Sequence, residues 1–140
     1  GPEPFDPEYT LAYFSDSLKT KNSSLKTVLM NQSIVTGLGN IYCDEVCFAA
    51  GVLPTRAAKS LSLAETKKLY TSIQKILTHA IELGGSSVAN YLLADGSRGN
   101  YAREHKVYGR TGKNCLVCST PLKTIKINSR TTVYCPKCQK

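Results

Sequence analysis

Apolar positions recur at helical intervals through the first half of the chain. A first helix is expected after Asp6-Pro7, where Asp6 would cap the helix and Pro7 would take its first position. Its buried face would consist of Leu11, Phe14 and Leu18. A second, short helix capped by Ser23 or Ser24 would bury Leu25, Val28 and Leu29. A third is expected from Asn40 to about Ala50, ended by Gly51.

The longest helical pattern begins at Ser62-Leu63-Ala64-Glu65, a capping-box sequence. Apolar residues then follow one face of the helix, namely Leu69, Ile73, Ile76, Leu77, Ala80 and Ile81. Gly84-Gly85 is expected to end this helix. A single helix of this length with one apolar stripe predicts a packed helical core.

The pattern changes beyond Gly85. Residues 86–101 are predicted to form a long loop with a short helical piece at 88–93, and long ordered loops in compact domains are often functional. After Tyr108-Gly109 two short runs rich in β-branched residues occupy 122–127 and 131–134. Asn128-Ser129 joins these runs, which predicts a β-hairpin.

Charge separates the same two regions. The 140-residue chain carries a net charge of +8, and 41 % of its residues are apolar, enough for a packed core. Ten Lys or Arg residues face one acid, Glu104, between Arg98 and Lys140, whereas residues 1–97 hold eight bases and nine acids. A basic C-terminal third indicates a polyanionic partner, most simply nucleic acid, with a solvated basic tail as the alternative. No apolar run has the length of a membrane span, so no membrane role is expected.

Four cysteines in the basic region have the spacing of a zinc site. Cys115-x-x-Cys118 and Cys135-x-x-Cys138 are separated by sixteen residues, which would include the hairpin. Two such pairs can surround one tetrahedral Zn²⁺, and four protein ligands make the site structural rather than catalytic. Two disulfides or four unrelated thiols are the alternatives, but the chain shows no export signal that would favour disulfides.

The other cysteines and the histidines have simpler explanations. Cys43 and Cys47 are four residues apart in a predicted helix and are expected to be small core residues. His79 is expected to be a partly buried structural residue, and His105 to be solvated in its charged surroundings.

A glycine-containing turn precedes the third predicted helix. Gly37-Leu38-Gly39-Asn40 could bring backbone N–H groups and the positive end of the helix dipole to a phosphate. Asn40 could add a side-chain donor, with Tyr42 in the same first turn. Taken alone, this pattern is more typical of ordinary turn chemistry.

The combination of motifs resembles the formamidopyrimidine-DNA glycosylase and endonuclease VIII family. The resemblance begins with Leu25-Lys26, Leu29-Met30-Asn31-Gln32, Thr36-Gly37-Leu38-Gly39-Asn40-Ile41-Tyr42 and Asp44-Glu45. It continues in order through Ala50-Gly51-Val52-Leu53-Pro54, Gly84-Gly85-Ser86, Val107-Tyr108-Gly109-Arg110 and Tyr134-Cys135-Pro136. These matches extend over essentially the whole chain and imply a helix–two-turn–helix DNA-binding domain followed by a zinc finger.

The resemblance also implies roles for individual residues. Gly39, Asn40 and Tyr42 would hold the phosphate beside the lesion, and Lys26 would approach the same backbone. Arg130, at the tip of the hairpin, would clamp the phosphates beside the flipped nucleotide. The loop at 92–101 would form a lid over that nucleotide, through Asp95, Gly96, Gly99 and Tyr101; an ordinary surface loop is the alternative.

Enzymes of this family excise oxidised bases and then cut the strand. Their nucleophile is an N-terminal proline amine in a separate β-sandwich domain. Pro2 follows Gly1, so its nitrogen is an amide, and Gly1 to Pro4 instead resemble the linker between the family's two domains. The expectation is therefore a fragment, or one piece of a split protein, that is inactive alone and needs an N-terminal catalytic domain.

The chain departs from the family pattern at three positions. Ser119 and Asn128 stand where the family usually has glycine, and Val133 stands where an aromatic residue is common. Asparagine tolerates the left-handed backbone conformation, so the hairpin turn at Asn128 can be retained.

Together these observations predict a mostly α-helical fold with a small β-hairpin zinc finger, divided into a helical domain at 1–108 and a four-cysteine zinc ribbon at 109–140. The expected function is that of the DNA-binding half of a repair glycosylase and AP lyase for oxidised purines. It would bind damaged double-stranded DNA as a monomer in the bacterial cytoplasm, on the DNA of the nucleoid. The alternative is a zinc-ribbon module that binds RNA or the ribosome.

Overall fold

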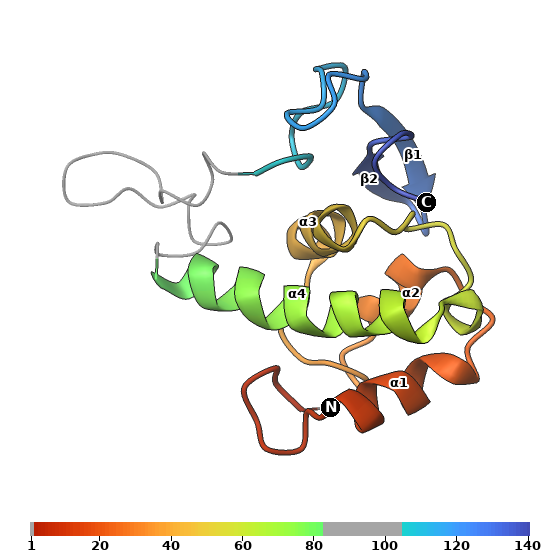
Figure 1. Cartoon of the computed structure of the whole chain (residues 1–140), viewed down its shortest axis with the longest axis vertical. Helices are drawn as coiled ribbons and strands as arrows, with labels where there is room; N and C mark the ends of the chain where they lie inside the picture. The colour runs from red at the N-terminus through yellow and green to blue at the C-terminus, as the bar shows by residue number, and fades with distance from the viewer. Residues whose placement is uncertain (1, 83–104) are drawn as a thin grey trace.

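A computed structural model describes residues 2–82 and 105–140 of the chain (Figure 1). The described helices are α1 (Leu11–Lys19), α2 (Leu25–Leu29), α3 (Asn40–Ala50), the 3₁₀ turn η1 (Ala58–Ser60) and α4 (Leu63–Glu82). Strands β1 (Lys123–Ile127) and β2 (Arg130–Tyr134) follow near the C-terminus. The long helix α4 crosses the middle of the molecule, with α1 on one side and α3 between it and the hairpin (Figure 1). The predicted fold class is confirmed.

The start of α1 differs from the expectation. Thr10, not Asp6, caps the helix, and its Oγ1 accepts a hydrogen bond from Tyr13 N at 3.1 Å. The Asp6 carboxylate instead accepts from the backbone N–H of Glu3 at 2.9 Å, behind it in the chain. Asp6 therefore stabilises a turn before the helix, because its side chain is bonded backwards instead of to the first turn of a helix.

The caps predicted at the starts of α2 and α4 are confirmed. Ser24 caps α2 through a bond from Thr27 N to Ser24 Oγ at 3.3 Å. At the start of α4, Ser62 N donates to Glu65 Oε1 at 2.9 Å and Glu65 N donates to Ser62 Oγ at 3.1 Å, the reciprocal pair of a capping box. Local sequence thus determines where these helices begin.

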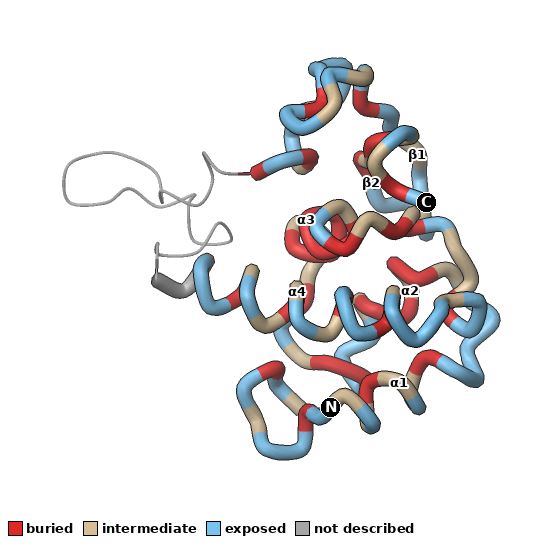
Figure 2. Tube along the Cα trace, in the orientation of Figure 1, coloured by how far each residue is buried: buried red, intermediate tan, exposed pale blue. Residues whose placement is uncertain are grey.

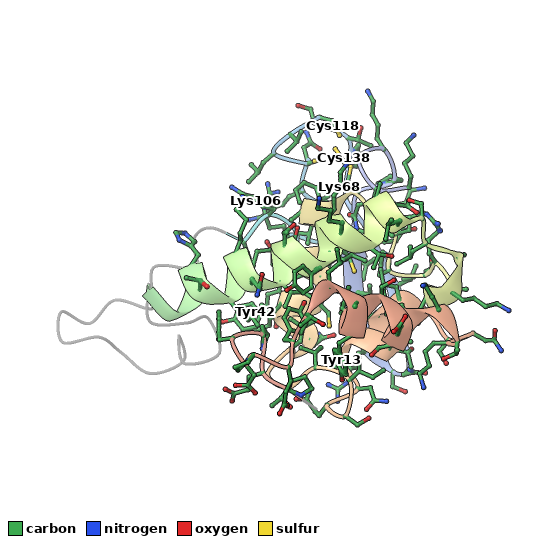
Figure 3. All side chains as sticks on the ribbon, turned by 60° about the horizontal axis from the view of Figure 1, so that its bottom comes forward. Tyr13, Tyr42, Lys68, Lys106, Cys118 and Cys138 are labelled. Carbon is green, nitrogen blue, oxygen red and sulfur yellow. The ribbon has the colours of Figure 1, made fainter. Side chains whose placement is uncertain are left out.

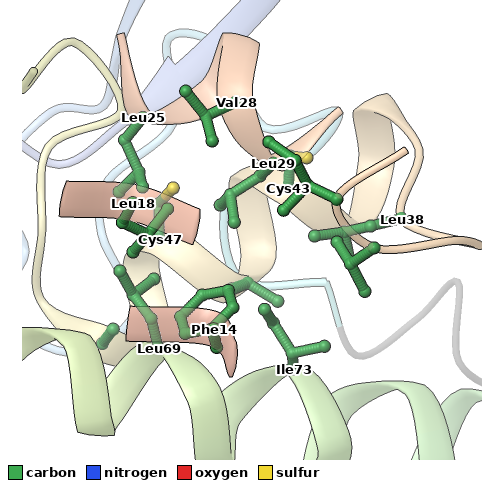
Figure 4. Packing of buried hydrophobic residues seen from close by; sticks show 14 of the residues in the cluster. Phe14, Leu18, Leu25, Val28, Leu29, Leu38, Cys43, Cys47, Leu69 and Ile73 are labelled. Atoms are coloured by element: carbon green, nitrogen blue, oxygen red, sulfur yellow. The ribbon is translucent and has the colours of Figure 1, made fainter. Parts of the chain in front are cut away.

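One apolar core lies among the four helices (Figures 2 and 4). It contains Phe14 and Leu18 from α1, Leu25 and Leu29 from α2, Cys43 and Cys47 from α3, and Leu69 and Ile73 from α4. Of the stripe predicted for α4, Leu77 is also buried and Ile76 packs against the cluster. The side chains of Ala80 and Ile81 and the glycines 84 and 85 lie outside the described residues. The helical part therefore folds around buried apolar surface.

The strands β1 and β2 pair antiparallel, with Lys123 opposite Tyr134 and Ile127 opposite Arg130. Asn128 and Ser129 form the two-residue turn, and both have positive φ, 50° and 66°. Two successive residues with positive φ are the signature of the type I′ turn that matches the twist of a hairpin. The turn predicted at Asn128-Ser129 is present, and β2 begins one residue earlier than expected.

Both histidine predictions were wrong. His105 is buried, at 8 % exposure, and its ring meets the edge of Tyr108 with 5.5 Å between centroids. Burial lowers the pKa of His105, while the nearby Glu45 carboxylate raises it. His79 is exposed near the end of α4. A charged stretch of sequence did not reveal that His105 belongs to a segment packed onto α3.

Within residues 2–82 and 105–140, none of the helices combines the length and apolarity of a membrane span.

Candidate nucleic-acid interface and zinc site

The four cysteines of the two Cys-x-x-Cys pairs lie close together at the end of the molecule beyond α3. Cys115 Sγ and Cys138 Sγ are 3.9 Å apart, and Cys118 Sγ and Cys135 Sγ are 3.5 Å apart. All four sulfurs lie within 4.8 Å of one another, and the sulfurs of Cys118 and Cys138 sit together in Figure 3. Zinc–sulfur bonds of about 2.3 Å require sulfurs about 3.8 Å apart in a tetrahedron. The four thiols therefore fit one zinc ion.

Backbone geometry supports the same assignment. Val117 N donates to Cys115 Sγ at 3.4 Å, and Cys138 N donates to Cys135 Sγ at 3.3 Å. In each Cys-x-x-Cys pair, the first sulfur therefore accepts a backbone hydrogen bond. Bonds from Thr120 lower the pKa of Cys118 to about 6, whereas burial and the other cysteines raise that of Cys138 to about 12. Zinc is bound by thiolates, so a bound ion would displace the proton of Cys138. The site is structural, because all four positions are taken by protein.

The predicted assignment of Cys43 and Cys47 to the core is confirmed. Both are completely buried in the helical cluster, and burial raises the pKa of each thiol. Within the described part of the chain, Cys115, Cys118, Cys135 and Cys138 form the only group with metal-binding geometry.

The turn before α3 is shaped by a residue that sequence reasoning missed. Gln32 Oε1 accepts from Gly37 N at 2.9 Å, and Gln32 Nε2 donates to Leu38 O at 3.3 Å. Gly37 has a φ of 97°, whereas Gly39, the N-cap of α3, is extended and caps the helix with no side-chain bond. One glutamine thus closes the loop that presents the start of α3. The sequence gives Gln32 no role beyond its place in the motif, because these two bonds reach residues five and six positions ahead.

Asn40 links the start of α3 to the hairpin. Its Nδ2 donates to the carbonyl oxygen of Thr131 at 3.3 Å, and its Oδ1 is buried with no hydrogen-bond partner among the described residues. The Thr131 bond fixes which way the amide faces and leaves the second Nδ2 hydrogen for another acceptor. Tyr42, predicted beside Asn40, is only 7 % exposed and packs into the helical core.

Lys26 is enclosed where α2, α3 and β2 meet. Its Nζ donates to Asp44 Oδ1 at 2.8 Å, to Thr132 Oγ1 at 2.7 Å and to Thr131 O at 3.2 Å, and the side chain is 1 % exposed. Asp44 Oδ2 accepts from Val133 N at 3.1 Å. Burial raises the pKa of Asp44, and Lys26 opposes that shift. Lys26 therefore faces the hairpin backbone and not solvent, a placement its sequence neighbours did not indicate.

Two further buried residues attach residues 105–140, the zinc module, to α3 and to Val52 just after it, and the sequence analysis assigned a role to neither. The Glu45 carboxylate accepts from the backbone N–H groups of Lys106, Val107 and Tyr108 at 2.7, 2.9 and 2.9 Å. Gln139 Oε1 accepts from Cys135 N at 2.7 Å, and Gln139 Nε2 donates to Val52 O at 3.0 Å. The bonds of Glu45, and the bond from Gln139 to Val52, reach backbone more than 60 positions away, so they leave no local pattern in the sequence.

Arg130 occupies the tip of the hairpin, as predicted. It is exposed and directly precedes Thr131, the residue whose carbonyl binds Asn40 and Lys26. Its guanidinium makes no hydrogen bond or ion pair with any residue in the ranges 2–82 and 105–140, so its donors are available to a ligand. The predicted lid residues Asp95, Gly96, Gly99 and Tyr101 lie outside the described residues.

Comparison with known proteins identifies these regions. Residues 1–91 match the family described as the formamidopyrimidine-DNA glycosylase H2TH domain, and residues 112–140 match the zinc finger found in FPG and IleRS. The formamidopyrimidine-DNA glycosylase of Listeria innocua is 47 % identical over all 140 residues, and that of Serratia proteamaculans is 41 % identical. The chain spans about half the length of these relatives, 51 % and 52 %.

Solved structures agree. The MutM (Fpg) protein of Thermus thermophilus matches with a TM-score of 0.91 at 38 % identity, over 99 % of this chain and 53 % of that one. The Lactococcus lactis Fpg in complex with DNA containing an abasic site matches with a TM-score of 0.91 at 37 % identity, over 100 % of this chain and 51 % of that one. With both sequence segments and the whole described fold in agreement, the chain belongs to the formamidopyrimidine-DNA glycosylase family and carries its H2TH domain and its zinc finger.

Proposed function

We propose that this chain is the DNA-binding half of a base-excision-repair glycosylase and AP lyase for oxidised purines. One observation carries the proposal: the start of α3 and the tip of the hairpin are joined through Thr131, which accepts a bond from Asn40 and directly follows Arg130. A helix N-terminus, an amide donor and an arginine fork are the groups that bind phosphates on either side of an extruded nucleotide.

The charge of the zinc module supports a nucleic-acid partner. Residues 105–140 contain eight Lys or Arg residues and no Asp or Glu. Phosphate neutralisation by such a surface releases counterions, so binding should weaken steeply as salt increases. In the Lactococcus lactis relative, the bound ligands include DNA with an abasic site and DNA containing Fapy-dG. These ligands motivate the choice of damaged duplex DNA for this chain.

The test compares the affinity of variants for a duplex that contains a tetrahydrofuran abasic-site analogue, measured by fluorescence anisotropy. Asn40→Ala and Arg130→Ala should each cost about 1–3 kcal/mol if they bind phosphate. Arg130→Ala should also reduce the slope of log K against log salt by about one. Lys19→Ala removes one exposed positive charge from α1 and serves as the control.

Two outcomes would contradict the proposal. Wild-type affinity in both Asn40→Ala and Arg130→Ala would remove the phosphate-clamp assignment. Stronger competition by double-stranded RNA than by abasic-site duplex DNA would favour the zinc-ribbon RNA-binding alternative. Comparing the two competitors on the same protein separates these functions, because both depend equally on bulk positive charge.

The remaining parts of the proposal concern the enzyme as a whole. Catalysis would depend on an N-terminal domain that supplies a proline amine, with a lid at 92–101 over the lesion, in a monomer that acts in the bacterial cytoplasm on the nucleoid. Mixing this chain with a separately made N-terminal domain should restore cleavage of an 8-oxoguanine duplex. An enzyme-like borohydride-trapped adduct formed by the 140 residues alone would contradict the assignment of the nucleophile to that other domain.

A further inference from the structure

We infer that Asn128 positions Arg130: by bonding Thr27 of α2, the Asn128 side chain fixes the hairpin tip at the orientation in which the Arg130 guanidinium reaches phosphate. Asn128 Nδ2 donates to Thr27 Oγ1 at 2.8 Å, a contact between residues 101 positions apart. The inference rests on the proposed function, because it assigns Arg130 to a DNA phosphate. Asn128 itself touches no ligand in this role.

The acceptor of this bond, the Thr27 hydroxyl, is itself held by Ser24. Thr27 Oγ1 lies 2.8 Å from Ser24 Oγ, the residue that caps α2, and Ser24 Oγ accepts from Thr27 N. With Asn128 as donor, the Thr27 hydroxyl is free to donate its own hydrogen to Ser24. The start of α2 therefore provides a fixed point to which the hairpin tip is attached.

The tip needs such an attachment because it is not packed flush against α2. A recess of about 170 Å³ lies between them, lined by Lys26, Thr27, Met30, Ile127, Asn128 and Arg130. The long Arg130 side chain borders this recess, so packing against α2 does not by itself determine its direction. The Asn128–Thr27 bond joins two residues that line this recess and sets the distance between the turn and the helix.

The strand that follows Arg130 is also anchored to α2. Lys26 binds Thr131 O and Thr132 Oγ1, which immediately follow Arg130. Asn128 lies two residues before Arg130, so the arginine sits between one buried anchor and one at the turn. Fixing the backbone on both sides limits the directions that an otherwise unbonded side chain can take, and this reduces the conformational entropy lost on binding.

The turn geometry supplies a variant that removes the contact and keeps the backbone. Asn128 has a φ of 50°, a conformation that glycine adopts at no steric cost. Asn128→Gly therefore removes the side-chain bond while leaving the type I′ turn intact. Ser129→Gly is the matched control, because Ser129 has a φ of 66° in the same turn and takes no part in the Thr27 bond. Thr27→Val removes the acceptor with similar shape, and Thr27→Ser retains the hydroxyl.

The experiment measures affinity of the 140-residue zinc-loaded chain for the tetrahydrofuran duplex over a series of salt concentrations. Asn128→Gly and Thr27→Val should each weaken binding about threefold to tenfold, the size expected for one hydrogen bond. Thr27→Ser and Ser129→Gly should bind like the unaltered chain. In an Arg130→Ala background, Asn128→Gly should have no further effect, because the residue it positions is gone.

The outcomes separate this inference from the proposed function. If Arg130→Ala weakens binding while Asn128→Gly does not, the positioning role is overturned and the DNA-binding role stands. A loss from Asn128→Gly that persists in the Arg130→Ala background, or an equal loss from Ser129→Gly, also overturns it, because the effect would not pass through the Thr27 bond to Arg130. If Arg130→Ala itself has no effect, the positioning role is overturned because Arg130 does not bind phosphate, and the DNA-binding role then depends on the result for Asn40→Ala.

Discussion

The helical region and the zinc module of this chain are stabilised in different ways. The helices bury a continuous apolar cluster from α1 to α4, with Phe14, Leu29, Leu69 and Ile73 at zero exposure. The zinc module buries only Val107, Cys115, Leu122, Val133 and Cys135 as its own cluster. An apolar core of that size cannot offset the entropy of ordering the segment, so the metal must supply much of its folding free energy.

The junction between the two regions differs from both. It consists largely of buried polar contacts. The Lys26–Asp44 pair bonds to β2, Glu45 accepts from the backbone of residues 106–108, and Gln139 donates to Val52 O. Polar contacts are directional, so they specify a single relative orientation where apolar surfaces could slide. A phosphate-binding site assembled from both regions requires that orientation. Mutations in the helical core, the zinc module and the junction should therefore have distinguishable effects on folding.

The largest effect should follow loss of the metal. Chelation of zinc, or Cys135→Ser, is expected to unfold the hairpin module and to leave most of the helical circular-dichroism signal, because the helices have their own core. Apparent zinc-binding free energies in isolated zinc fingers are about 10–16 kcal/mol, and most of that would be lost. Elemental analysis of protein purified without chelator should give one zinc per chain.

The matched control is the same thiol-to-hydroxyl change in the other region. Cys43→Ser should retain one zinc but lower the unfolding midpoint of the helices, because it places a hydroxyl in a fully buried apolar cluster. If Cys135→Ser instead removed the helical signal and Cys43→Ser removed zinc, the two regions would not be separable in this way.

A smaller effect is expected at the junction. Asp44→Ala should cost about 3–5 kcal/mol in urea unfolding, since it leaves the buried Lys26 ammonium without its counter-ion and the Val133 N–H without its acceptor. Asp16→Ala removes an acid from an exposed ion pair with Lys19 and should cost about 0–1 kcal/mol. A cost at Asp44 no larger than that at Asp16 would show that the junction contributes little to holding the regions together.

The smallest effect should come from the polar contacts of the helical region. Glu65 closes the capping box of α4 and also pairs with Arg56 at 3.0 Å, which lowers the pKa of its carboxyl. Glu65→Ala should cost about 1 kcal/mol, and Glu65→Gln less, because glutamine can still complete the capping box. Thermal unfolding of both variants measures the difference between their losses of stability. Equal losses would assign the stability to the Arg56 pair instead of the cap.

The sequence predicted features that depend on neighbouring residues. The bounds of α3, the capping box at Ser62 and Glu65, the turn at Asn128-Ser129 and the cysteine spacing all reflect interactions within a few positions, so local rules apply. The Thr10 cap of α1 was missed because Asp6-Pro7 carries an equally good local signal. For such features the sequence alone is nearly sufficient.

The features that build the candidate interface were less accessible. Lys26 contacts residues 105 and 106 positions away, and Glu45 reaches residues 61 to 63 positions away. A lysine and a glutamate in predicted helices carry no mark of burial, because Lys26 is covered by hairpin residues 131 and 132 and Glu45 by residues 106–108 only in the folded chain. The positions of Asn40 and Arg130 were predicted through resemblance, and their connection through Thr131 required the folded chain.

That connection has a consequence for genetics. The acceptor shared by Lys26 and Asn40 is the main-chain carbonyl of residue 131, while the Thr131 side chain is exposed and bonds only Lys126 among the described residues. Codon changes at this position leave the carbonyl in place, so a saturation screen would score residue 131 as tolerant although its backbone joins the two halves of the interface. Only chemical synthesis that weakens this carbonyl, as an amide-to-ester exchange between residues 131 and 132 does, would expose its contribution.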